Sequence, residues 1–167
     1  MRALASLVEY PLLQAETAAV ATAKQLINVR TGEGVVSSIW HTYGIIERYT
    51  PRLVSDMRAA RQQHGQISFT AINHLHYPVA LACLALLPLI AGYALRRHGL
   101  ADIGEFATTC LFAVLANAFV CGVLSNPHDR YGARLVWLAV AAAALTAVRL
   151  YEQRQRLPIG DIVAAAQ

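Results

Sequence analysis

Charged side chains are scarce in this sequence. Only 14% of its 167 residues are Asp, Glu, Lys or Arg, whereas 56% are hydrophobic and the mean hydropathy is +0.42. Because a soluble domain carries about 25% charged residues, this balance excludes an ordinary soluble protein and predicts an integral membrane protein. The 13 Arg and single Lys form no run of five or more. Nucleic-acid binding, which needs a clustered basic face, is therefore not expected.

Cysteine is also scarce, and recognisable catalytic motifs are absent. Cys83, Cys110 and Cys121 lie inside apolar runs, and none has a CxxC or other metal-type spacing. We interpret them as small packing residues. The sequence contains no nucleophile elbow, phosphate loop, HExxH or paired-carboxylate motif. No catalytic residue is therefore predicted, and a non-enzymatic protein is favoured.

Long apolar segments are what the sequence has instead. The clearest covers residues 77–95 and would be about 28 Å long as a helix, which matches the thickness of bilayer hydrocarbon. Residues 106–124 form a second apolar segment, and a third enters lipid near Tyr131 and leaves near Tyr151. The predicted fold class is therefore all-α, a polytopic membrane protein with three transmembrane helices preceded by short amphipathic helices.

The predicted domain boundaries follow from these segments. Residues 1–73 form an extramembrane helical part, residues 74–152 the transmembrane region and residues 153–167 a polar tail. Three helices are expected in the first part: from Pro11 to about Asn28, through Val36 to Ile46, and from a Thr50–Pro51 cap to about Gln63. TGEGVV, residues 31–36, separates the first two. Their core is thin, so we expect this part to lean on the bilayer or on a partner.

Two polar stretches are expected at one face of the membrane. NHLHYP, residues 73–78, precedes the first span, and SNPHDRYGAR, residues 125–134, joins the second span to the third. Because one span crosses and the next returns, both stretches reach the same side. Asn126 and Pro127 have the pattern of a helix N-cap followed by proline, which would place the Asp129 carboxylate at the third helical position.

Histidine and carboxylate groups at this face are suitable metal ligands. His74 and His76 are two residues apart, about 200 degrees around a helix, so they cannot face the same ion. His76, His128 and Asp129 remain as the candidate set for a metal or haem. The favoured alternative is structural and requires no cofactor: Asp129 caps the third helix, and the histidines form hydrogen bonds at the interface.

Other residues are expected to hold the helices together. Ala118 and Gly122 form a small-xxx-small pair that would let the second span approach the third, and Asn117 would add an interhelical hydrogen bond worth about 0.5–2 kcal/mol. Arg130 and Arg134 are expected at lipid phosphates or at the capping carboxylate. The residues with predicted structural roles are Asn117, Ala118, Gly122, Asn126, Pro127, Arg130 and Arg134.

The opposite face carries a second set of charges. Asp102 and Glu105 have the spacing of a capping box, and Glu105 is placed to pair with Arg149. Arg96 and Arg97 close the first span at this face. With the N-terminal part outside, five arginines lie inside and four outside, which by the positive-inside rule slightly favours that orientation, with the C-terminus inside.

Three runs carry a resemblance to known proteins: PRLVSDMRAARQQHGQISFTAINH, HLHYPVALACLALLPL and NAFVCGVLSNPHDRYGARLVWL. They resemble a group of uncharacterised bacterial inner-membrane proteins that share a His-Asp-Arg-Tyr turn before the last helix. The similarity covers about residues 50–150. It implies a location in a bacterial inner membrane and no particular activity. Members of the group have an additional N-terminal hydrophobic helix, so the resemblance also implies that this chain is a shortened form of a longer protein.

The functional prediction is an integral membrane protein that acts as a non-enzymatic subunit or scaffold of a membrane complex. Its expected partners are the lipid bilayer and other membrane subunits or further copies of the chain. Two alternatives stay open. One is a metal- or haem-binding membrane component, and the other is a small transporter subunit, which would need several copies because three thin helices cannot enclose a wide aqueous path.

Overall fold

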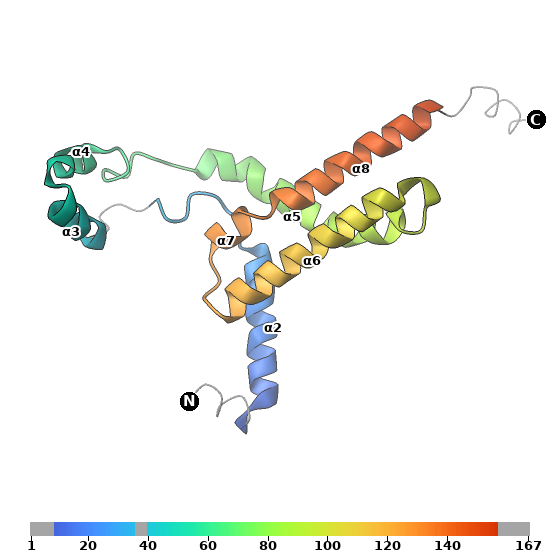
Figure 1. Cartoon of the computed structure of the whole chain (residues 1–167), viewed down its shortest axis with the longest axis horizontal. Helices are drawn as coiled ribbons and strands as arrows, with labels where there is room; N and C mark the ends of the chain where they lie inside the picture. Colours follow the sequence, from blue (N-terminus) through green and yellow to red (C-terminus); the bar gives the residue numbers. More distant parts are fainter. Residues whose placement is uncertain (1–8, 36–39, 157–167) are drawn as a thin grey trace, which may run out of the picture.

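The computed structural model describes residues 9–35 and 40–156, which fold into helices with no strand among them (Figure 1). In chain order the elements are α2 (Pro11–Ile27), α3 (Trp40–Tyr49), the 3-10 turn η1 (Pro51–Leu53), α4 (Val54–Ala59), α5 (Thr70–Ala94), the 3-10 turn η2 (His98–Leu100), α6 (Ala101–Val123), α7 (Asp129–Ala133) and α8 (Trp137–Arg156). The predicted all-α class is confirmed.

Three helical segments of the described chain are long and apolar enough to cross a membrane. They are Thr70–Ala94, His98–Val123 and Asp129–Gln155, with mean hydropathies of 1.8, 2.0 and 1.7. They coincide with the three predicted spans. The third consists of α7 and α8 joined by a tight turn, in which the N–H groups of Leu135 and Val136 both donate to the carbonyl of Gly132, at 3.0 and 2.9 Å.

Small side chains form most of the contacts among the spans, and many large apolar ones face outward. The main cluster joins α5, α6 and α8 through Leu87, Ala91, Ala107, Cys110, Ala139 and Ala142. Leu89 and Phe112 are each 66% exposed, and no more than 28% of the apolar window of any span is buried. In a soluble protein the large apolar side chains would be inside. The arrangement seen here suits helices that are surrounded by hydrocarbon, where close contact between small residues replaces the hydrophobic effect. The fold is that of a membrane-embedded protein.

The first helix, α2, packs against α6 rather than against α3 or α4. Figure 1 shows α2 crossing the C-terminal part of α6 at a steep angle. A Cβ atom added at Gly122 would lie 2.7 Å from the carbonyl oxygen of Ala21, so the absence of a side chain there permits the crossing. Gly122 was predicted to face the third span. That prediction was wrong, because α2 occupies this surface of α6.

Helices α3 and α4 form an arm that projects away from the spans (Figure 1). Within the arm, the Tyr43 hydroxyl donates to Gln63 Oε1 at 2.8 Å, and Arg58 pairs with Glu47 at 3.1 Å. The helix predicted from Pro51 begins there, but its α-helical part ends at Ala59, before the predicted end. Residues 36–39, where the preceding helix was expected to begin, lie outside the described residues.

Both helix caps predicted for the spans were wrong. Helix α6 begins at Ala101, so Asp102 lies in its first turn and forms an ion pair with Arg149, the partner predicted for Glu105. Helix α7 begins at Asp129, with His128 rather than Asn126 at the N-cap position and no side-chain cap. In both places the carboxylate has a partner from a distant segment, which local spacing does not reveal.

Candidate functional site

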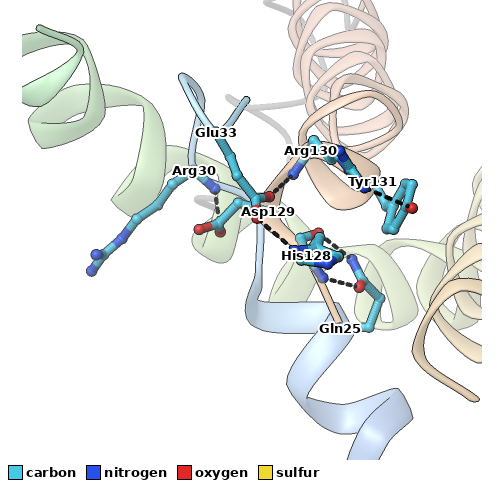
Figure 2. A network of polar contacts seen from close by, with 7 residues as sticks. All are labelled: Gln25, Arg30, Glu33, His128, Asp129, Arg130 and Tyr131. Carbon is cyan, nitrogen blue, oxygen red and sulfur yellow. Dashed lines mark hydrogen bonds and ion pairs between the residues drawn. The ribbon is translucent and has the colours of Figure 1, made fainter. Parts of the chain in front are cut away.

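The polar groups at one end of the spans gather around the loop that follows α2. Residues 28–35 of this loop contact the start of α5 and the turn between α6 and α7 (Figure 2). Gly32 and Gly34 have φ angles of +99° and +93°, a left-handed conformation that glycine adopts without strain. A Cβ atom at Gly32 would lie 2.5 Å from the Phe69 ring. The predicted breaker is therefore a loop whose glycines allow it to lie close against the rest of the protein.

Gln25 joins α2 to the turn before α7. Its Nε2 donates to the His128 carbonyl at 2.9 Å, and its Oε1 accepts from the His128 N–H at 2.8 Å (Figure 2). The side chain is only 1% exposed. One buried amide thus satisfies a backbone donor and a backbone acceptor at once, an arrangement that would be expensive to disrupt.

Asn73 of α5 makes the same kind of contact with the loop itself. It accepts from the Thr31 N–H and donates to the Thr31 carbonyl, both at 2.9 Å. One turn further along α5, His76 Nε2 lies 2.8 Å from the Val29 carbonyl oxygen. Because a carbonyl oxygen can only accept, Nε2 carries the proton. Two side chains of α5 therefore satisfy three backbone groups of the non-helical loop.

Carboxylates complete the network. The Arg30 N–H donates to Asp129 Oδ1 at 2.9 Å, so Asp129 binds the loop instead of capping its own helix. Glu33 Oε1 lies 2.6 Å from His128 Nδ1, and its Oε2 accepts from the Arg130 N–H at 2.7 Å. Figure 2 shows Glu33 between the loop after α2 and the turn before α7, whereas the Arg30 guanidinium points away from that turn. That guanidinium lies over the Tyr77 ring, 4.6 Å from its centroid.

The pKa of Glu33 reflects these contacts. Partial burial is the largest single influence and would raise it. The Arg130 N–H, the His128 ring and the charges of His128 and Arg130 together outweigh burial and hold the pKa of Glu33 below its ordinary value. The carboxylate is therefore favoured in its ionised form, which is the form that accepts both hydrogen bonds.

The three candidate metal ligands lie in one region but have different partners. His76 contacts Val29, His128 contacts Glu33 and Asp129 contacts Arg30. Within residues 9–35 and 40–156, no group of three or more His, Cys, Asp or Glu side chains is arranged to hold a metal ion. Metal or haem binding by His76, His128 and Asp129 stays a prediction. Metal analysis and an absorption spectrum of the purified protein would test it.

The residues predicted to have structural roles surround this network. Asn117 donates to the Tyr131 carbonyl at 3.4 Å and accepts from the Cys121 thiol at 3.5 Å. Ala118, 2% exposed, lies beside it in the contact between α2 and α6. The Arg130 guanidinium lies 5.0 Å from the centre of the Tyr131 ring. The remaining residues of the set are in the turn or shortly after it: Asn126 and Arg134 are exposed, and Pro127 is half-buried.

Sequence reasoning missed the groups contributed by the N-terminal part. Gln25, Arg30 and Glu33 received no predicted role, although between them they form all five hydrogen bonds described above between the network and residues 128–130 of the turn. Gln25 did carry one signal, since it is a long polar side chain on the helix face that also carries Ala18 and Ala21. Pairing it with His128 requires knowledge of a contact across 103 residues.

The opposite end of the spans is held by simpler contacts. Arg149 of α8 pairs with Asp102 of α6, and Gln153 Nε2 donates to the Gly99 carbonyl at 3.0 Å. The side chains of Arg149 and Asp102 are 42% and 59% exposed. Together the two contacts fasten α8 to η2 and to the first turn of α6.

In chemical terms, the network around the loop is a set of completed hydrogen bonds. Within the described part of the chain, no buried side-chain nitrogen or oxygen lacks a hydrogen-bond partner. The network connects α2 and the loop after it to α5 and to the turn before α7. Comparison of the chain with protein-family models, with curated proteins and with solved structures found no match.

Proposed function

We propose that this chain is a multi-pass protein of a bacterial inner membrane and acts as a non-enzymatic subunit or scaffold of a membrane complex. Helical spans support the inner membrane, because single-chain proteins of the bacterial outer membrane are β-barrels. The resemblance of residues 50–150 to bacterial inner-membrane proteins supports the same location. Both arguments concern the location of the protein and are independent of any substrate.

The observation that carries the proposal is that the polar side chains form hydrogen bonds between segments of the same chain. Gln25, Asn73 and Glu33 each bond two groups on a distant segment, so they join α2, α5 and α7 into one unit. The large apolar side chains, by contrast, remain on the outside of the spans and on the arm. A rigid, internally satisfied unit with a wide apolar exterior is what a subunit needs in order to present surfaces to lipid and to neighbouring proteins.

The arm formed by α3 and α4 is the part that we expect to contact a partner. Ile45 is 60% exposed, Tyr49 71% and Leu53 47%, a high exposure for large side chains in a short helical hairpin. Exposed apolar groups that are contiguous and bordered by charge are typical of interaction surfaces. The Arg48 guanidinium lies 5.6 Å from the centroid of the Tyr49 ring, and Glu47 and Arg52 are close to these residues in the sequence.

Photo-crosslinking in native membranes tests this role. A benzophenone amino acid at Tyr49 should give a discrete protein adduct, whereas the same group at lipid-facing Phe112 should not. A product of twice 18.1 kDa would identify a second copy of the chain, and any other discrete mass would identify another subunit. Absence of a protein adduct at Ile45, Tyr49 and Leu53, together with a monomer in native mass spectrometry from mild detergent, would refute the proposal.

Reporter fusions test the multi-pass arrangement. Fusions after Arg97 and after Arg154 should report one compartment, and a fusion in the turn at Asn126 should report the other. The predicted orientation places the Asn126 fusion outside. All three fusions reporting the same compartment would contradict a three-span protein.

A further inference from the structure

We propose that the end of α2 and the loop after it form a re-entrant membrane segment. In this proposal α2 enters the hydrocarbon from the side of the polar network and ends beside the spans. Residues 28–31 then return to the same face. The outward surface of α2 is covered by lipid acyl chains. The inference replaces the predicted extramembrane placement of residues 11–31 and does not depend on the proposed subunit role.

The first argument is depth. Leu26 and Ile27 line a groove together with Leu84 of α5 and Leu115 of α6. On α5 the groove begins at Leu81, four residues beyond Tyr77, the predicted start of the apolar segment, and at 1.5 Å per residue this is about 6 Å below the interface. On α6 it begins at Leu115, nine residues before the end of the apolar segment, or about 14 Å. Leu26 and Ile27 therefore border a groove whose walls lie within a hydrocarbon layer about 30 Å thick.

The second argument concerns the face of α2 that packs against the rest of the protein. Ala21 and Gln25 face α6 and the turn, while Leu13, Val20 and Ile27 are 59%, 48% and 54% exposed. These three residues are seven apart, so they share one side of the helix. A helix on a water-soluble core would bury this side. Turning small and polar residues toward the protein and large apolar ones away is the pattern of helices packed within a membrane.

The outward face of α2 also continues an existing lipid-facing surface. Leu115 of α6 is 39% exposed, and Ala85 and Pro88 of α5, which line the same groove, are exposed as well; all three are parts of membrane spans. The groove that Leu26 and Ile27 share with these helices opens onto that surface. Acyl chains that cover the spans would therefore cover the end of α2 without a break. Lys24, one turn before the end, has a stem long enough to carry its ammonium group toward the interface.

The third argument concerns the returning backbone. Non-helical backbone is tolerated at membrane depth only where protein groups satisfy its donors and acceptors. Four groups of the returning backbone have such partners: the Val29 carbonyl accepts from His76, the Arg30 N–H donates to Asp129, and both Thr31 groups bond Asn73. Val29 itself is 2% exposed and packs between Ala80 and Val136. In this proposal the network supplies protein partners to backbone that returns through the edge of the membrane.

Collision accessibility of nitroxide labels measures the proposed depth. Single labels are placed at Leu13, Val20 and Ile27 of the full chain in liposomes, and accessibility to oxygen is compared with accessibility to a water-soluble nickel complex. The oxygen-to-nickel ratio should rise from Leu13 through Val20 to Ile27, and the value at Ile27 should be several-fold above that at Leu13. The native cysteines Cys83, Cys110 and Cys121 are first replaced by alanine.

Two reference positions make the result decisive. Phe112, lipid-facing in the middle of α6, gives the value for hydrocarbon, and Gln66, exposed in the loop before α5, gives the value for water. A ratio at Ile27 close to that at Phe112 supports the proposal. It is overturned if the ratio at Ile27 equals that at Gln66, if all three positions of α2 give one ratio, or if Ile27 is closed to both reagents because protein covers it.

A second measurement applies if the cysteine-free chain does not fold. A tryptophan at position 27 (Ile27→Trp), with Trp40 and Trp137 replaced by phenylalanine, is quenched by lipids brominated at different depths. Bromine deep in the acyl chain should quench it more strongly than bromine near the headgroup. Stronger quenching from the headgroup side would refute a re-entrant segment.

Discussion

The closest backbone approach in the polar network yields a sharp prediction at Gly132. A Cβ atom there would lie 2.1 Å from the carbonyl oxygen of Asn28 and 3.0 Å from Cγ1 of Val29. The first contact is with backbone, which cannot rotate away as a flexible side chain does. Gly132→Ala must therefore shift the loop after α2 away from α7. Gly92→Ala is the matched control, because a Cβ atom there meets nothing within 4 Å.

The expected magnitude follows from overpacking. Forcing an extra methyl group into a filled contact costs about 1–3 kcal/mol. This cost falls on the docked state of the loop, in which the amides of Arg30 and Thr31 donate to Asp129 and Asn73. Because 1.4 kcal/mol is a tenfold change in an equilibrium, the open state of the loop should become about 5- to 150-fold more populated.

Hydrogen exchange followed by mass spectrometry measures this population. In Gly132→Ala, peptides covering residues 28–33 should exchange about 5- to 150-fold faster than in the parent protein, while peptides from the middle of α5 should not change. In Gly92→Ala both regions should match the parent. Unchanged exchange at residues 28–33 in Gly132→Ala would refute the close approach. Equally faster exchange throughout the spans would refute the view that the loop docks and opens as a local unit.

Three further predictions concern other contacts. Gln25→Leu leaves the N–H and C=O of His128 without their partner and should lower the free energy of unfolding by about 2–5 kcal/mol, measured by denaturation in detergent; a loss below 1 kcal/mol would mean that water replaces the amide. Because the folded pKa of Glu33 is lowered, its contacts stabilise the loop above the ordinary glutamate pKa of about 4.3, and this stabilisation is lost as the pH falls through the lower folded pKa. A spin label on the loop should become more mobile on acidification in the parent protein but not in Glu33→Gln, and an identical response in both would contradict the assignment. The half-exposed pair of Asp102 and Arg149 should show only a weak coupling in a double-mutant cycle, and added salt should remove it; a strong coupling that salt does not change would indicate that lipid or a partner shields the pair.

The spans and most helix boundaries were predictable because they depend on local properties of the chain. An apolar run of bilayer length has few stable alternatives to a helix, so residues 77–95, 106–124 and 131–151 fall within the three long apolar helical segments except for residues 95 and 124, each one position past the end. Helix α2 begins at Pro11 as predicted and ends one residue before Asn28. The glycines of TGEGVV produce the break after it, because their backbone angles are ones that other residues avoid.

The candidate site was predictable only in part. Because consecutive spans cross the membrane in opposite directions, Asn73, His76, His128 and Asp129 were predicted at one end of the protein. The structure joins all four to the same region. Their partners could not be predicted. Glu33 meets His128 across 95 residues of sequence, and no local spacing encodes such a pairing. The failed caps at Asp102 and Asp129 have the same cause, since a distant partner competed successfully for each carboxylate.

The sequence alone therefore determined that this chain forms apolar helices of membrane length, where their apolar parts lie, and which polar stretches share a face. Only the tertiary structure decided what each helix packs against. The period of α2 shows that it has two faces, but it does not show whether protein, water or lipid lies beyond each one. The contact of Ala21 with Gly122 and the burial of Gln25 resolve this for one face, because both require α6 and the following turn, which are about 100 residues away.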